Sequence, residues 1–385
     1  MSASSGSSVR VSQPMLDLHA ESGDETTPWN AALDVRGRRT LRTSGALSRE
    51  DTEARVYRAS FGWCDPRSGV VASAGRIASP SLASVSLFDG GLVETGKGRW
   101  RAGAFGGTQP DPDRMRWSSR IREAGAFVEA RSAAGAARRW QAGAGAVSSW
   151  DRTISDRDFL FGQGWYQDRR WSASWLQEAD VVRPWKRVPG EAGFSFTSTF
   201  VTTQVNVGPR FSVRGGYDGR RNVRLWRDRI TPETEFDDRY RQGVWTGGTA
   251  RLPAGVTLAA DRRWSQGGGE DATVSNGSLE LRPRVRTAPA LRTRWSEYRS
   301  DLSSTRLLAG SLGCQPVERA YVEASGGERR TTLIGAAADP PVRWWGATAD
   351  VTIGQRWFAD FSWEASKSSL ESTSQLYAGL SRRLP

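Results

Sequence analysis

The chain has little histidine, cysteine and lysine, and these shortages exclude whole classes of site. Among its 385 residues there is one histidine, His19, and there are two cysteines, Cys64 and Cys314. A zinc site needs about four such ligands, and a disulfide scaffold needs several cysteine pairs. We therefore expect neither, and the sequence leaves open whether Cys64 and Cys314 pair with each other or stay as free thiols.

Long apolar runs are also missing. The longest stretches without a charged residue are Ile77–Phe88 and Ala192–Gly208, and both are interrupted by Ser, Thr, Pro or Gly. A membrane-spanning helix needs about 20 apolar residues in a row, so none is expected. Met1–Thr27 is polar and lacks the apolar segment of a secretory signal peptide. We expect that the true start lies upstream of Met1 or that the chain is truncated.

Aromatic residues and arginine are abundant. The chain has 18 Trp, 13 Phe and 42 Gly, and its 54 Lys plus Arg exceed its 42 Asp plus Glu by 12 charges. The hydrophobic fraction of 37% is low for a globular protein, yet this aromatic content excludes a disordered chain. Because only Lys97, Lys186 and Lys367 are lysines, the positive charge is nearly all arginine.

Apolar residues recur at every second position along most of the chain. Trp357, Ala359, Phe361, Trp363 and Ala365 alternate with polar or charged neighbours for most of that run. The same alternation is found in four further segments, which are 100–104, 171–175, 211–217 and 256–260. Turn residues such as Gly208-Pro209 separate these segments, so the pattern predicts an all-β chain with no long helix.

The length of the alternating segments distinguishes between classes of β protein. Strands of soluble sandwiches average about five or six residues, whereas strands that cross a bilayer need about 9–11. We predict a single closed transmembrane antiparallel β-barrel of about 16–20 strands, with 18 as the best estimate. A polar, flexible segment over 1–28 would precede the barrel over 29–385. Six tryptophans near segment ends are expected in interface girdles: Trp100, Trp140, Trp171, Trp264, Trp345 and Trp357.

Two stretches are more particular than the alternation. Ser212–Val244 and Gly75–Glu94, the latter containing Phe88-Asp89-Gly90, resemble segments of uncharacterised bacterial outer-membrane β-barrel proteins of a porin-like kind. The resemblance extends as a series of strand-and-loop patterns from Val56 to Leu380. It implies a location in the outer membrane of a Gram-negative bacterium and a passive channel or scaffold.

The polar faces of the predicted strands supply candidates for the pore wall. An arginine-lined lumen favours anions, because the guanidinium is a fixed charge that binds phosphate or carboxylate in a bidentate manner. Two other roles for the arginines stay open: cross-strand Arg–carboxylate pairs that stiffen the wall, and contacts with lipid phosphates at the rim. The pore-lining candidates are Arg99, Arg101, Arg214, Asp261, Arg263 and Asp360.

The stretch Gly75–Glu94 breaks the alternation around Ser79-Pro80-Ser81. We predict that it folds into the barrel as a constriction carrying Arg76, Asp89 and Glu94, the alternative being an ordinary hairpin loop.

A second loop is acidic. Its residues Glu233, Glu235, Asp237 and Asp238 are weak candidates for a calcium site, and pairing with neighbouring arginines is the alternative. No cofactor is expected. Nucleic-acid binding is not expected either, because the basic residues are evenly spread and form no known motif.

No enzyme motif is present, and a catalytic triad would depend on His19 in the polar N-terminal segment. Carboxylates on predicted strands (Glu129, Glu178, Asp261 and Glu280) leave a glycosidase pair open. We expect a porin-like channel, not an enzyme, that passes small anionic or neutral solutes with a mild anion preference. Its partners would be the bilayer, lipopolysaccharide and the barrel-insertion machinery. The alternatives are a structural or surface-display barrel with a filled lumen, and a soluble Trp-rich carbohydrate protein.

Overall fold

The computed structural model describes residues 9–23, 27–44, 47–65, 67–82, 85, 87–183, 193–223, 225–226, 240–267, 271–283, 285, 287–336 and 339–382. Within these residues the chain is all-β, with two single-turn 3₁₀ helices, η1 (Pro80–Leu82) and η5 (Pro253–Gly255). No helix in the described part of the chain is long and apolar enough to cross a membrane.

The strands follow one another almost without interruption. They are β1 (Val9–Ser12), β2 (Met15–Ser22), β3 (Trp29–Ser44), β4 (Leu47–Asp65), β5 (Val70–Ile77), β6 (Phe88–Lys97), β7 (Trp100–Thr108), β8 (Ile121–Arg131), β9 (Arg139–Asp151), β10 (Ile154–Gln167), β11 (Trp171–Val181), β12 (Phe194–Asn206), β13 (Phe211–Arg220), β14 (Arg241–Arg251), β15 (Val256–Gln266), β16 (Ala272–Leu281), β17 (Ala290–Ser300), β18 (Ser303–Val317), β19 (Ala320–Leu333), β20 (Val342–Ile353), β21 (Trp357–Lys367) and β22 (Ser372–Arg382).

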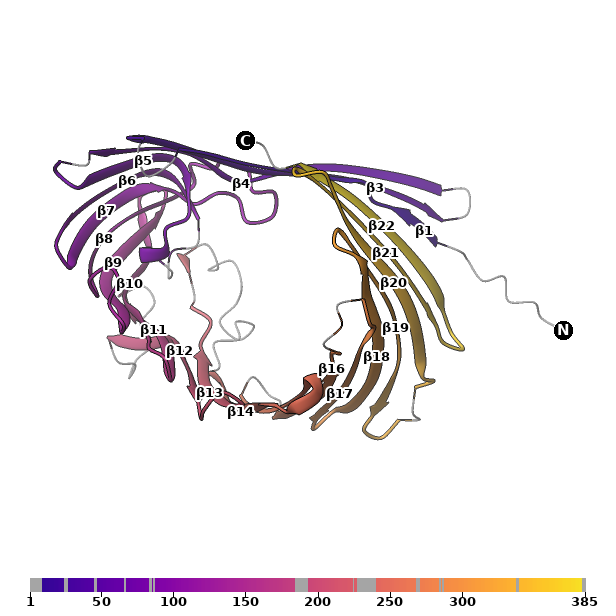
Figure 1. Ribbon diagram of the computed structural model, residues 1–385. Helices are drawn as coiled ribbons and strands as arrows, with labels where there is room; N and C mark the ends of the chain where they lie inside the picture. Colours follow the sequence, from indigo (N-terminus) through magenta and orange to yellow (C-terminus); the bar gives the residue numbers. More distant parts are fainter. Residues whose placement is uncertain are drawn as a thin grey trace.

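The strands form one nearly closed antiparallel barrel (Figure 1). From β3 to β22 each strand pairs with the next along the chain. Strands β1 and β2 both pair with the other edge of β3, because Val9–Ser12 lie opposite Leu41–Ser44 and Met15–Ser22 lie opposite Ala31–Arg38. The 22 strands therefore occupy 21 positions around the barrel.

The predicted class is confirmed, but the best estimate of 18 strands is wrong. The strands beyond residue 28 run from β3 to β22, and β1 and β2 come from the segment predicted to be flexible. Counting apolar alternation misses strands such as β3, which has charged residues at Arg36, Arg38 and Arg39. The domain boundary at residue 28 stays a prediction, although β2 lies before it.

The odd number of positions determines how the two edges of the sheet are related. Because neighbouring strands alternate in direction, the first position, filled by β1 and β2, and the last, filled by β22, run the same way. No pairing joins these two edges within the described residues. Figure 1 shows β22 approaching the sheet near β3, while β1 and part of β3 continue past that point.

The hairpin of β3 and β4 leaves the wall at a β-bulge. The register between these strands shifts between Asp34 and Val35. Strand β4 pairs with β5 only over Ala59–Asp65, so its earlier residues have a paired neighbour on one side only. A bulge bends a strand and raises its twist, which accounts for the change of direction at this point.

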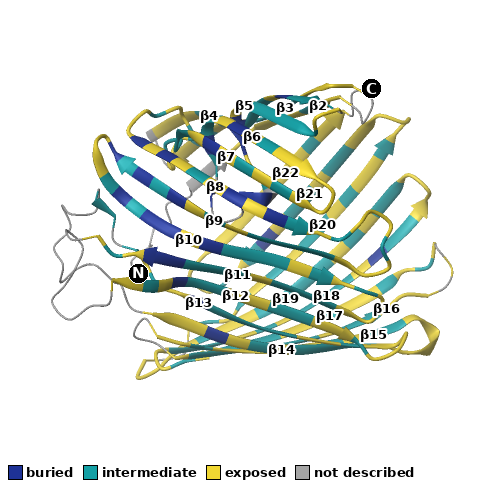
Figure 2. Cartoon of the chain, turned by 90° about the vertical axis from the view of Figure 1, so that its left-hand side faces the viewer, coloured by how far each residue is buried: buried dark blue, intermediate teal, exposed yellow. Residues whose placement is uncertain are grey.

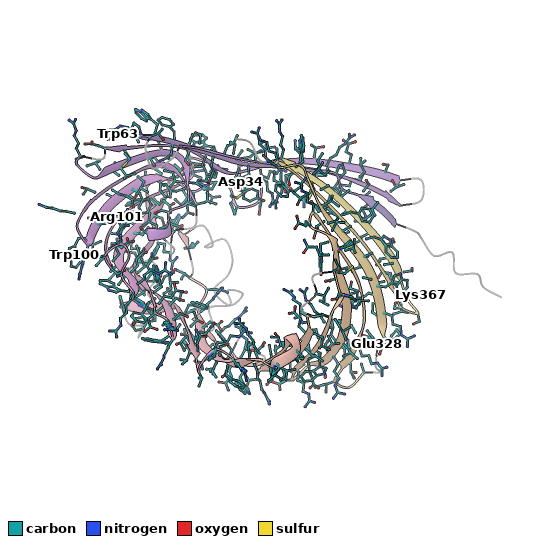
Figure 3. The ribbon with its side chains drawn as sticks, in the orientation of Figure 1. Asp34, Trp63, Trp100, Arg101, Glu328 and Lys367 are labelled. Atoms are coloured by element: carbon teal, nitrogen blue, oxygen red, sulfur yellow. The ribbon has the colours of Figure 1, made fainter. Side chains whose placement is uncertain are left out.

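The two faces of the wall differ in polarity. In β21, Trp357, Phe361 and Trp363 lie on one face, and Asp360 and Glu364 lie on the other. Figure 3 shows the same division in the N-terminal part of the barrel, with Trp63 and Trp100 on the outside of the ring and Asp34 on the lumen side. Figure 2 shows that buried residues gather on β8, β9 and β10.

Candidate functional site: the luminal wall

Charged residues on the luminal face of β13 to β17 form cross-strand pairs. The guanidinium of Arg214 on β13 lies 3.4 Å from the Asp261 carboxylate on β15. Asp261 also accepts a hydrogen bond of 2.8 Å from Asn276, which in turn accepts one of 2.7 Å from Ser296 on β17. A second pair on the same face joins Arg263 to Asp218. Since successive side chains of a strand point to opposite faces, this polar row follows from the period-two pattern.

A second polar network lies on the luminal face of β6 to β10. Arg101 on β7 is 3.7 Å from Glu94 on β6. Glu129 on β8 accepts hydrogen bonds from the Ser81 hydroxyl at 2.9 Å and from the Gln141 amide at 2.7 Å. The indole N–H of Trp165 donates to the side-chain amide oxygen of Gln141 at 3.1 Å. The network thus holds η1, which carries Ser81, against the wall.

The segment around η1 also supplies an apolar contact inside the barrel. Leu82 is fully buried, and Val85 and Phe88 are nearly so. They form one cluster with side chains of β5 to β10, namely Ile77, Leu92, Phe105, Phe127, Val147, Phe159 and Phe161. Gly103, Gly125 and Gly145 alternate with these aromatics across neighbouring strands, and a Cβ there would lie 2.6 Å from a phenylalanine ring atom. The glycines therefore leave room for the rings that η1 packs against.

A cavity of about 350 Å³ lies beside this cluster, near the ends of β10 to β13. Arg157 on its wall donates to Asp180 and to Glu178, each at 2.8 Å, and stacks 4.1 Å over the Phe159 ring. Thr197 donates to Asp180 at 2.9 Å. The backbone N–H of Trp226 donates to Asp156 at 2.6 Å, which attaches the segment after β13 to β10.

The structure places most of the predicted pore residues on the luminal face. Arg101, Arg214, Asp261 and Arg263 belong to the pairs described above. Asp360 shares the face of Glu364, and its carboxylate lies over Gly379, where a Cβ would be 2.3 Å from Oδ1. Arg99 lies in the turn between β6 and β7, outside the strands. That these residues line an open pore stays a prediction.

Of the three residues of the predicted constriction, Arg76 and Asp89 meet, and Glu94 lies apart from them. Arg76 forms a bidentate pair with Asp89, both contacts being 2.6 Å, and it also donates to the carbonyls of Val56 and Met115. Glu94 lies five residues after Asp89 in an unshifted strand, so the two side chains point to opposite faces. Instead, Ser81 and Leu82 are the residues that lie on the luminal side of the wall. The break in alternation at Ser79-Pro80-Ser81 indicated where this segment is, but not which of its side chains contact the wall.

The remaining candidates from the sequence are the acidic loop, the two cysteines and the four strand carboxylates. Glu233, Glu235, Asp237 and Asp238 lie outside the described residues. Within the described residues no group of three or more potential metal ligands is found. Cys64 and Cys314 are free thiols. The carboxylates considered for a glycosidase pair each have a partner: Glu129 bonds Ser81 and Gln141, Glu178 bonds Arg157, Asp261 pairs with Arg214, and Glu280 pairs with Arg282. That the chain is not an enzyme stays a prediction.

No protein-family model and no curated protein sequence matches the chain. Among solved structures, the translocation pore of the P pilus usher PapC has 10% identity and a TM-score of 0.46, and the alignment covers 97% of this chain and 95% of that one. A loop-deletion mutant of OmpT, an outer membrane protein of Vibrio cholerae, has 8% identity and a TM-score of 0.38, with 76% and 96% covered. A mutant of the Rh. blastica porin has 11% identity and a TM-score of 0.35, with 68% and 91% covered. These likenesses are too distant to carry a functional argument.

Proposed function

We propose that the chain is a bacterial outer-membrane barrel that forms an aqueous channel for passive diffusion of small solutes. One observation carries the proposal: the strands β13 to β17 have a charged, hydrogen-bonded luminal face, and the strands β14 to β18 have an apolar outer face. On the outer face Val244, Leu258, Trp264, Trp295 and Leu308 are all exposed by about 40% or more. A soluble protein does not expose so many large apolar residues on one surface, whereas a lipid bilayer covers them.

The hydrogen bonding of the backbone also supports a location in the lipid bilayer. From β5 to β21 every strand is paired on both sides, so the backbone N–H and C=O groups of this part of the wall are satisfied without water. This is the condition for crossing the hydrocarbon layer with strands. The partners that follow are the bilayer, lipopolysaccharide and the insertion machinery. The same apolar outer face argues against the soluble carbohydrate-binding alternative.

The proposed anion preference depends on arginines that have no carboxylate partner. Arg214 and Arg263 are paired and contribute little net field. Arg294 on β17 and Arg329 on β19 share the luminal face, and among the described residues neither has an ion-pair partner. Asp350 and Asp360, directly opposite each other on β20 and β21, have none either. Because unpaired charges of both signs share the luminal face, the preference for anionic over neutral solutes is small.

A filled-lumen scaffold is the second candidate function, and η1 is the observation that favours it. Leu82 and its cluster occupy the luminal side of β6 to β10, and the segment reaching Trp226 approaches the same side. If these segments fill the remaining space of the lumen, the barrel is a structural or surface-display protein.

Planar-bilayer recording of the refolded protein separates the two candidates. An open channel gives stepwise conductance increments, and the reversal potential in a salt gradient gives the sign of its selectivity. Insertion shown by heat-modifiable gel mobility, without any conductance step, would reject the channel and leave the scaffold. A protein that stays monodisperse in buffer without detergent would reject both.

A further inference from the structure

The outer face of β17 to β21 ends in charged residues at one rim only. Glu297 and Arg299 lie near the end of β17, Arg306 near the start of β18, Glu328 and Arg330 near the end of β19, Arg343 at the start of β20 and Lys367 at the end of β21. We refer to these seven residues as the arginine belt, and Figure 3 labels Glu328 and Lys367 within it.

The alternation of the strands places the belt on the outside. Arg306 is in phase with the exposed Leu308, Arg343 with Trp345, and Lys367 with Ala365, all on the apolar face. The opposite end of these strands is different. There the outer face stays apolar up to Leu291 and Ile353.

Charge within the belt is unbalanced. Arg299 and Arg306 both donate to Glu297, at 2.8 and 2.9 Å. Arg330 and Arg343 both donate to Glu328, at 2.5 and 2.9 Å. Lys367 has no carboxylate partner among the described residues, so five cations share two carboxylates. The four arginine side chains are 63–69% exposed.

Like charges also lie directly opposite each other. Arg306 faces Arg330 across the β18–β19 pair, and Arg343 faces Lys367 across the β20–β21 pair. Cross-strand pairs of like charge are destabilising unless an anion lies between them. Each guanidinium uses part of its donor fork on a glutamate and keeps further N–H groups directed at solvent, which suits bidentate binding of a phosphate oxygen pair.

We propose that the arginine belt binds the phosphate groups of anionic lipid headgroups at one surface of the membrane. Apolar residues that contact acyl chains lie immediately beside the belt, so the bound phosphate belongs to a lipid and not to a free ion. The proposal rests on the proposed membrane location but not on conduction.

Spin-labelled lipids test the proposal on the full chain refolded in phosphatidylcholine vesicles. The measured quantity is the association constant of labelled phosphatidylglycerol relative to labelled phosphatidylcholine. The natural protein should prefer the anionic lipid. The variant Arg299→Gln/Arg306→Gln/Arg330→Gln/Arg343→Gln should lose that preference, because a single arginine near an anionic surface accounts for roughly a fivefold difference in the association constant.

The matched control removes the same charge from the opposite end of the barrel. Arg210→Gln/Arg251→Gln/Arg319→Gln/Arg356→Gln changes four exposed arginines at that end and should keep the preference. An absent preference in the natural protein overturns the proposal. An equal loss in both quadruple variants also overturns it, because net charge alone would then explain the effect.

Further variants and a conductance measurement distinguish a wrong belt proposal from a variant that does not fold and from a wrong channel proposal. If the quadruple belt variant does not refold, Arg306→Gln/Arg343→Gln is compared with Arg251→Gln/Arg319→Gln by the same criterion. Replacement of the four belt arginines by lysine should restore much of the preference. Conductance should be the same in the belt variant and the natural protein, because the belt lies outside the lumen.

Discussion

Arg263 on β15 reaches across β14 to Asp218 on β13, and its Nη2 lies 2.8 and 2.7 Å from the two carboxylate oxygens. The strand between them contributes Gly243, where a Cβ would lie 3.0 Å from Asp218 Oδ1 and 3.3 Å from Arg263 Nε. The absence of a side chain at Gly243 therefore lets a pair form between strands that are not neighbours in the sheet.

Gly243→Val should break this arrangement. The added side chain is expected to lower the free energy of unfolding by about 1–3 kcal/mol, as overpacking does elsewhere. Urea unfolding of the refolded barrel, followed by tryptophan fluorescence, measures it. Gly248→Val is the control on the same strand, because a Cβ there meets only the Ser212 carbonyl, at 3.5 Å. Equal effects of the two substitutions would mean that the pair is not held through Gly243.

Asp261→Asn should move the selectivity of the channel toward anions. The substitution removes a luminal negative charge and leaves Arg214 without its carboxylate. The reversal potential in a salt gradient measures the change, and the shift should shrink at high ionic strength. Glu328→Gln removes the same charge from the outer face and should leave the reversal potential unchanged. A shift of the same size in Glu328→Gln would contradict a luminal origin.

Leu82→Ala should detach the η1 segment from the luminal wall. Leu82 is fully buried in the cluster with Phe88 and Phe105, so we expect a loss of about 2–5 kcal/mol in the free energy of unfolding. Single-channel conductance should rise as the segment becomes mobile. Leu376→Ala, at an exposed outer position on β22, is the control. Unchanged conductance together with lower stability would show that η1 packs on the wall without narrowing the lumen.

Asp168 should make stability depend on pH only in the acid range. It lies in the turn between β10 and β11, where hydrogen bonds from the backbone N–H groups of Trp171 and Arg170 and from the Tyr166 hydroxyl lower the pKa of its carboxyl. A lowered folded-state pKa gives stability that is present above the unfolded value of about 3.9 and is lost as the pH falls through the folded value. Unfolding free energies measured from neutral pH down to strong acid should therefore fall more steeply for the natural protein than for Asp168→Asn. Parallel curves would show that Asp168 does not contribute to the pH dependence of the free energy of unfolding.

Local pattern and long-range pairing explain which predictions hold. The outward positions of Trp357, Phe361 and Trp363 were predictable, because the direction of each side chain depends only on its place in a strand. The separation of Asp89 from Glu94 follows from the same rule, once the strand is known to run through both residues without a shift. Strand β2 was missed because Leu16 and Leu18 alternate with Asp17, His19 and Glu21 in a segment too polar to predict a strand.

The sequence by itself determined the all-β class, the apolar outer face and the polar inner face, because a period of two in hydrophobicity is a local property of the chain. Only the tertiary structure decided that Asp218 meets Arg263, that Ser81 bonds Glu129 and that two arginines share Glu297. Such contacts depend on the register between strands and on where a connecting segment folds. Register is set by the pairing of the whole sheet, which no single stretch of sequence specifies.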